Sequence, residues 1–172
     1  MGEVNMSVEA ELIDEHKVGI SQWKVVPAPH RMITLGLGSC VGVVLYDSVM
    51  RIGGMSHIML PDSSQFKKND NKGKFADTAI PMLLEEMQAI GARKRVIIAR
   101  IAGGAQMFSS EERKAVNNIG HRNVEKTFEV LDNLGIKVLA KDVGGNKGRT
   151  MIFDTADGSV WIRMLGQKTR LL

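Results

Sequence analysis

The sequence predicts a single α/β domain in which helices cover the outside of mixed β-sheets. Short apolar runs rich in β-branched residues, typical of buried strands, recur along the chain. Two longer segments in the second half carry apolar residues at three- and four-residue spacing, which is typical of amphipathic helices. The length of 172 residues suits one domain with a substantial core. Layering helices on sheets would bury both kinds of apolar face.

Strands dominate the expected first half of the chain, and each ends at a proline or a turn. Pro27 and Pro29 end the first strand, and Gly36 and Gly38 mark a glycine-rich turn after the second. A polar, charged surface loop over residues 62–74 follows the last of these strands. The expected strands cover residues 17–26, 31–37, 41–46 and 52–60.

Helices and strands alternate in the second half. Apolar residues from Ala76 to Ile90 predict a helix, with Pro81 inside the pattern leaving its start open. A second helix is expected to end at Gly135, and a final hairpin to turn at Asp157-Gly158, a strong two-residue turn signal. The remaining strands are expected at residues 95–101 and 136–141, and the hairpin at 151–164.

Composition excludes several classes of protein. With one cysteine, the chain forms no internal disulfide and no zinc site built on two or more cysteines. No apolar run approaches the ~18 residues of a membrane helix, and no signal peptide is recognisable, so a cytoplasmic location is expected. Residues 1–16 hold five acids and no Lys or Arg, and we expect a flexible tail there and a single domain over 17–172. The net charge is +4, but the basic residues are scattered along the chain and no nucleic-acid-binding motif is present.

Cys40, the lone thiol, ends a Gly-x-Gly-Ser-Cys turn between two apolar strands. Free cysteines are most often small buried hydrophobes. Here Gly36 and Gly38 permit a tight turn that aims a side chain outward and directs successive N–H groups, such as that of Ser39, at one point. Those N–H groups would hold an oxyanion, and the thiol would attack a carbonyl if a neighbouring base or dipole lowered its pKa. Cys40 is therefore a candidate nucleophile.

His57 and Thr34 are candidate partners for this thiol. By strand alternation His57 shares a face with Met55 and Met59, a setting that suits either a core histidine or a base in a dry pocket. Thr34 is either an ordinary strand residue or the hydroxyl that fixes the imidazole tautomer. A simple hairpin turning near residue 50 would set His57 opposite Val44, so pattern alone leaves the Cys–His pair open.

Several segments together resemble the CheD chemoreceptor glutamine deamidases of bacterial chemotaxis. The resemblance extends over most of residues 17–165 and is carried most specifically by the spacing of Thr34, Cys40 and His57. The matching segments are residues 34–41 (TLGLGSCV), 53–62 (GGMSHIMLPD), 74–78 (KFADT), 101–105 (IAGGA), 118–123 (NIGHRN) and 142–146 (DVGGN).

The resemblance implies a cytoplasmic thiol amidohydrolase that converts receptor glutamines to glutamates through a thioester. Its layers would be α/β/β/α, as in cysteine hydrolases. Cys40 would be the nucleophile, His57 the general base and acid, and Thr34 the orienting residue. Ser39 and Gly38 would contribute to oxyanion or substrate binding, and no metal or organic cofactor would be needed. A glutamyl methyl ester would suit the same machinery, because only the leaving group changes.

The resemblance also implies partners. These are a methyl-accepting chemoreceptor as substrate and a CheC-type phosphatase, for which Phe108 is a candidate anchor. No nucleic acid or membrane insertion is expected. The main alternative is a non-catalytic binding module that regulates the phosphatase. A weaker alternative is a metal-binding protein using Cys40 and some of the histidines, which no close His–His spacing supports.

Overall fold

The structure is a computed structural model that describes residues 12–107 and 118–172. Its strands are β1 (Glu15–Lys17), β2 (Trp23–Pro27), β3 (Arg31–Leu37), β4 (Val41–Asp47), β5 (Ile52–Ile58), β6 (Ile97–Gly103), β7 (Lys137–Val143), β8 (Arg149–Asp154), β9 (Val160–Met164) and β10 (Arg170–Leu171). The α-helices are α1 (Ala76–Ala89) and α3 (Ile119–Asn133), and the short 3-10 turns are η1 (Ser63–Gln65), η2 (Lys72–Lys74) and η3 (Lys94–Val96).

The strands form two five-stranded sheets. The central sheet has the order β2-β5-β4-β6-β7, and the outer sheet has the order β1-β3-β8-β9-β10. Both are mixed, because β6 and β7 pair in parallel in one and β1 and β3 in the other, whereas the other pairs are antiparallel. The chain crosses from the outer to the central sheet between β3 and β4, at residues 38–40.

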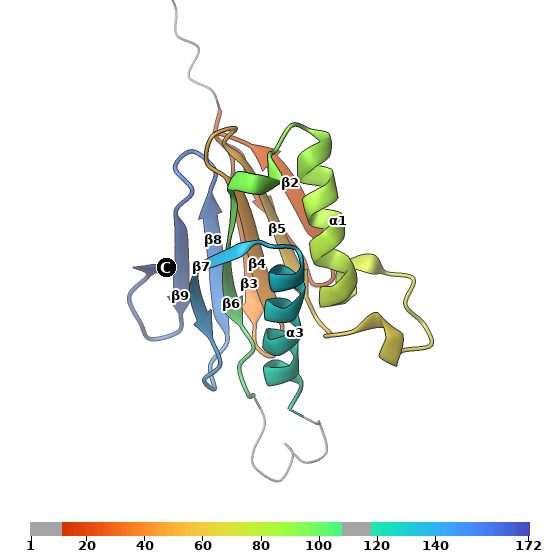
Figure 1. Cartoon of the computed structure of the whole chain (residues 1–172). Coiled ribbons are helices and arrows are strands. Elements are labelled where there is room, and N and C mark those ends of the chain that lie inside the picture. Colours follow the sequence, from red (N-terminus) through yellow and green to blue (C-terminus); the bar gives the residue numbers. More distant parts are fainter. Residues whose placement is uncertain (1–11, 108–117) are drawn as a thin grey trace, which may run out of the picture.

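Both α-helices of the described part lie on the central sheet (Figure 1). α1 packs on β2 and β5, α3 packs on β4, β6 and β7, and the helices contact each other. Side chains of β4 alternate between two apolar layers: Val43 packs toward the helices, and Val44 packs toward the outer sheet. Residues 41–47 are consequently buried throughout, as expected for a strand covered on both faces.

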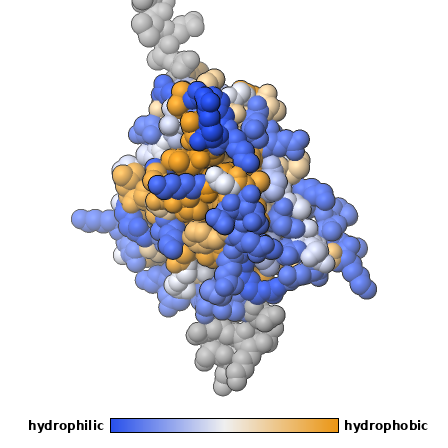
Figure 2. Space-filling model, viewed as in Figure 1, coloured by the Kyte–Doolittle hydropathy of each residue, from blue (hydrophilic) through white to orange (hydrophobic). Residues whose placement is uncertain are grey.

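The expected α/β class, with mixed sheets and helices outside, is confirmed. The layer order in the described residues is α/β/β, whereas a four-layer α/β/β/α order was expected. The free face of the outer sheet carries partly exposed side chains such as Leu35, Trp161 and Arg163. Figure 2 shows apolar surface over the strands beside the helices, bordered by hydrophilic residues.

Two strand predictions at the N-terminus need correction. The expected strand over residues 17–26 is two strands in different sheets, because the chain turns at residues 18–22, where Ser21 has a φ of 62°. Glu15 and His16, which we assigned to the flexible tail, belong to β1 and pair with β3. Two predictions for the second half are confirmed. The predicted first helix is α1, which continues through Pro81, and the final hairpin turns at Gly158, which has a φ of 79°.

In the described part of the chain, no helix combines the length and the apolar character needed to cross a bilayer.

Candidate active site

The turn that carries Cys40 is fixed by the backbone of the loop after β6. The N–H of Ala105 donates to the carbonyl of Gly38 at 2.7 Å, and the N–H of Gly104 donates to the carbonyl of Cys40 at 2.8 Å. The φ of Gly104 is +65°, and a Cβ there would lie 2.2 Å from Cγ2 of Val124 in α3. Glycine is therefore required for this loop to come close to both the Cys40 turn and the helix.

Asn123 ties the same turn to the end of β5. Its Nδ2 donates to the carbonyl of Ser39 at 2.9 Å and to that of Met59 at 3.0 Å. The side chain is fully buried, and its Oδ1 has no hydrogen-bond partner among the described residues. Asn123 thus fixes the spacing between the segments that carry Cys40 and His57.

Asn123 is not among the functional residues predicted from the sequence. A signal was present, because Asn123 and Thr127 are polar positions on the same face of α3 as Val130 and Leu131, which is the buried face. A polar residue at an apolar helical position usually has a specific hydrogen-bonding role.

His57 faces the layer between the two sheets. It pairs with Gly42 of β4, not with Val44 as the simple hairpin predicted, because the turn closes with Asp47 opposite Ile52. As expected, it shares its face with Met55, which is buried between the sheets. The expected third member, Met59, lies beyond the strand and is 41% exposed.

Thr34 reaches His57 from the other sheet. Its Oγ1 lies 2.7 Å from Nδ1 of His57 and donates to the carbonyl of Val18 at 2.8 Å. A threonine hydroxyl has one proton, so it must accept the hydrogen bond from the Nδ1–H of His57. The neutral imidazole therefore carries its proton on Nδ1 and leaves the Nε2 lone pair free. That is the tautomer that a general base requires.

Cys40 packs against the same inter-sheet layer, two residues before Gly42, the strand partner of His57. The thiol is partly exposed, whereas His57 is fully buried. Nε2 of His57 has no hydrogen-bond partner in the described residues, so it makes no bond to the Cys40 thiol. The structure thus brings the three sequence-predicted residues to one layer, with the Thr34–His57 bond formed and the thiol–imidazole bond unformed.

Both reactive groups are neutral at neutral pH. Burial lowers the pKa of His57 from 6.5 to about 4, because a charged imidazole would be poorly solvated there. Burial likewise raises the pKa of the Cys40 thiol, and the Cys40 backbone N–H only partly opposes this effect. Attack by Cys40 was expected to need a lowered thiol pKa, whereas burial raises the pKa of the thiol in the resting structure.

Among the described residues, no carbonyl accepts from the backbone N–H of Ser39 or Cys40. The N–H of Gly38, by contrast, donates to the carbonyl of Gly36 at 2.9 Å. A Cβ at Gly38 would lie 3.2 Å from Cγ of Met107, so a side chain at position 38 would have little room. Within the described part of the chain, the turn N–H groups that donate to no carbonyl are therefore those of Ser39 and Cys40.

Comparison with known proteins identifies the family. A family model described as CheD chemotactic sensory transduction matches residues 59–164. A probable chemoreceptor glutamine deamidase CheD of Desulforamulus reducens is 52% identical over 158 residues, covering 92% of this chain and 95% of the relative. This chain belongs to the CheD family.

Other curated CheD proteins agree. The probable chemoreceptor glutamine deamidase CheD of Clostridium novyi is 52% identical and that of Clostridium botulinum 53% identical; each match covers 92% of this chain and 98% of the relative. The part of this chain that the CheD family model matches begins after Thr34, Cys40 and His57. A match covering 92% of the chain, however, has to extend over these three positions. The predicted family resemblance is confirmed.

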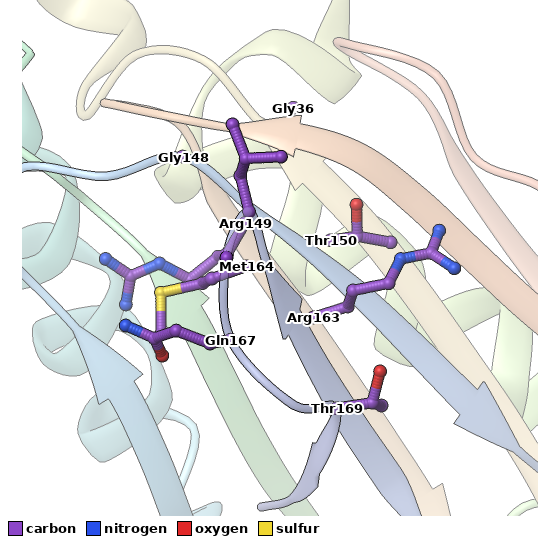
Figure 3. Close-up of a pocket in the computed structure, with 10 residues that line it drawn as sticks. Gly36, Gly148, Arg149, Thr150, Arg163, Met164, Gln167 and Thr169 are labelled. Carbon is purple, nitrogen blue, oxygen red and sulfur yellow. The ribbon is translucent and has the colours of Figure 1, made fainter.

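Two further features complete the description of this CheD family member. A pocket of 460 Å³ lies beside Gly36, at the ends of β8 and β9, and its lining includes neither Cys40 nor His57. Figure 3 shows that the side chains of Arg149 and Arg163 extend to opposite sides of this pocket.

Phe108, the predicted partner anchor, lies outside the described residues.

Proposed function

We propose that this chain is a thiol-dependent deamidase that converts glutamine side chains of chemoreceptors to glutamates. The proposal is supported above all by the Thr34–His57 hydrogen bond, which leaves a buried imidazole lone pair beside the turn of the lone thiol. It is further supported by the name that the relatives carry, chemoreceptor glutamine deamidase. A cysteine and a histidine that only fill the core would not need a fixed imidazole tautomer beside the thiol turn.

The first half of the reaction forms a thioester. Nε2 of His57 takes the proton of the Cys40 thiol as Sγ bonds to the carboxamide carbon of the substrate glutamine. The carbonyl electron pair moves to oxygen, and the N–H groups of Ser39 and Cys40 stabilise this oxyanion. When the oxyanion collapses, His57 gives its proton to the departing nitrogen, and ammonia leaves.

The second half restores the thiol. His57 takes a proton from water, the hydroxide attacks the thioester carbon, and the C–S bond breaks. The sulfur recovers its proton from His57, and glutamate remains on the receptor. The reaction as written uses no metal or organic cofactor. A glutamyl methyl ester would follow the same steps with methanol as the leaving group.

Neutral resting groups suit this sequence. A thiolate–imidazolium pair would be poorly solvated in the inter-sheet layer, so the proton moves only as the carbon–sulfur bond forms. Thr34 accepts from Nδ1 throughout and keeps the ring proton on that nitrogen, which leaves the Nε2 lone pair for the thiol proton. Thr34 is therefore a positioning residue, while Cys40 and His57 are the catalytic residues. Gly38 acts through its lack of a side chain, since its own N–H is already engaged.

The proposed partners follow from the same role. The substrate is a methyl-accepting chemoreceptor, met in the cytoplasm, and a CheC-type phosphatase is a further partner. Phe108 stays a candidate anchor for that phosphatase.

The decisive experiment incubates the protein with purified chemoreceptor and measures glutamine-to-glutamate conversion by mass spectrometry. We expect the wild type to convert specific sites and the Cys40→Ala variant to convert none above background. A His121→Gln variant, altered at an exposed residue of α3, is the matched control and should retain activity. Equal conversion by the wild type and Cys40→Ala would overturn the assignment of the nucleophile. No conversion by either, with phosphatase binding retained, would favour the binding-module alternative.

A further inference from the structure

A cluster of metal-ligating side chains lies at the N-terminal end of the described chain. Asp14, His16 and His30 each offer one ligand atom, and these atoms lie within 4.8 Å of one another. The rings of His16 and His30 meet edge to face with centroids 5.5 Å apart. No part of the proposed deamidation uses these residues, and Cys40 is not a member of the cluster.

Main-chain pairing brings the three residues together. β1 and β3 pair in parallel with His16 opposite Met32, and the N–H of Arg31 donates to the carbonyl of Asp14 at 2.9 Å. His30 ends the turn before β3 and is thereby held next to Asp14. The cluster is therefore part of a sheet edge, although His16 and His30 are fourteen residues apart in the sequence.

The ligand atoms are largely uncommitted. Among the described residues, the carboxylate of Asp14 forms no ion pair or hydrogen bond, and the His16 ring forms neither and makes one ring contact, with His30. Nδ1 of His30 accepts only a long bond of 3.3 Å from the N–H of Asp14. By strand alternation the exposed Lys17 points to the other face of β1, so its ammonium does not compete for this position.

We propose that Asp14, His16 and His30 bind a divalent transition metal, with Zn²⁺ as the best-suited ion. Two imidazoles and one carboxylate form a ligand set that zinc accepts, with the fourth position open to water. Mg²⁺ and Ca²⁺ prefer oxygen ligands and suit this set poorly. Tetrahedral zinc places its ligand atoms about 3.3 Å apart. The ligand atoms now lie within 4.8 Å of one another, so metal binding would require rotation of the exposed Asp14 and the half-buried histidines to close that spacing.

The metal would act on the fold near the thiol site without entering the reaction. β1 leads directly to Val18, whose carbonyl accepts the hydroxyl proton of Thr34, and β3 carries Thr34 itself. The ligands come from the segment that leads into Val18 (Asp14 and His16) and from the turn before β3 (His30). A bound metal would therefore hold together the two segments that the Thr34–Val18 hydrogen bond joins. Since the ion binds the folded arrangement, it stabilises the native state.

The test is zinc titration of the full chain, free of any histidine tag, by isothermal calorimetry and thermal denaturation. We expect one Zn²⁺ per chain and a rise in Tm with Zn²⁺ but not with Mg²⁺. Either His16→Gln or His30→Gln should weaken zinc binding at least about tenfold. Asp14→Asn, which removes a negative charge at an exposed position, should weaken zinc binding as well.

Two control variants separate this site from the other zinc-binding groups of the chain. His121→Gln removes the exposed His121–Glu125 pair, and Cys40→Ser removes the thiol. Both should bind zinc as the wild type does, and the apo form of every variant should keep the apo Tm of the wild type within a few degrees. The proposal is overturned if the wild type binds no Zn²⁺, if the His16 and His30 variants bind it unweakened, or if only a control variant loses it. None of these readouts depends on deamidation.

Discussion

Thr34 and His57 form a hydrogen bond of 2.7 Å although they are 23 residues apart and belong to different sheets. The bond extends to the carbonyl of Val18, so a chain of three groups fixes the imidazole. The direction of this chain decides which ring nitrogen keeps its proton.

Replacing Thr34 tests this positioning role. Thr34→Val keeps the shape but removes the acceptor for Nδ1–H, so the imidazole loses its fixed tautomer and direction. We expect kcat for receptor deamidation to fall by about 10- to 100-fold, a range typical of misplaced catalytic groups. Thr34→Ser retains the hydroxyl and should restore most of the rate. A Ser variant as slow as the Val variant would show that the methyl packing, not the hydrogen bond, is what matters.

Asn123→Ala tests the connection between the Ser39 turn and the end of β5. The change removes two part-buried hydrogen bonds, to the carbonyls of Ser39 and Met59, at a cost of about 0.5–1.5 kcal/mol for each bond. We expect lower free energy of unfolding in urea and a lower kcat. Thr127→Val is the matched control on the same buried face of α3, because the Thr127 hydroxyl has no partner in the described residues. That variant should be at least as stable as the wild type.

The His57 environment predicts an acid-dependent loss of stability. The pKa of His57 is about 4 in the fold against 6.5 ordinarily, so its contribution is fully present above pH 6.5 and is lost as the pH falls toward 4. Between pH 7 and pH 5 the linked loss is about 2 kcal/mol. Urea unfolding of wild type and His57→Gln at both pH values measures it. The wild type should lose more stability than the variant, and parallel pH profiles would contradict the buried neutral imidazole.

Cys40 should react slowly with alkylating agents in the resting protein. Burial raises the pKa of its thiol, so less thiolate is present at pH 7 than in an unfolded cysteine. Iodoacetamide labelling of the single thiol, followed by mass spectrometry, should be slower in the folded protein than in urea. Its rate should rise with pH through a midpoint above the ordinary cysteine pKa. Faster labelling in the folded state would indicate a preformed thiolate and a different order of proton transfer.

Much of the fold could be predicted because local patterns determine it. The turn at Asp157-Gly158 and the apolar spacing of α1 depend on neighbouring residues only. The division of residues 17–26 between two sheets could not be predicted, because each half reads as a strand and only pairing with β3 or β5 separates them.

The site divides in the same way. Cys40 and its glycine turn are visible in the sequence, and the family resemblance adds His57 and Thr34. The register that sets His57 opposite Gly42 depends on how the turn after Asp47 closes, where its carboxylate accepts from the N–H groups of Val49 and Met50. The contribution of Asn123 comes from a helix more than sixty residues further along, a contact that no local pattern contains.

The crossover at residues 38–40 has a consequence for which parts of the fold the proposed site requires. The Cys40 thiol and the His57 imidazole belong to the central sheet and its entry turn, while the Thr34 hydroxyl that holds the imidazole belongs to the outer sheet. Without the packing of one sheet on the other, the imidazole would lack its acceptor and would be free to rotate. Neither sheet contains the site alone, so it depends on the contact between them.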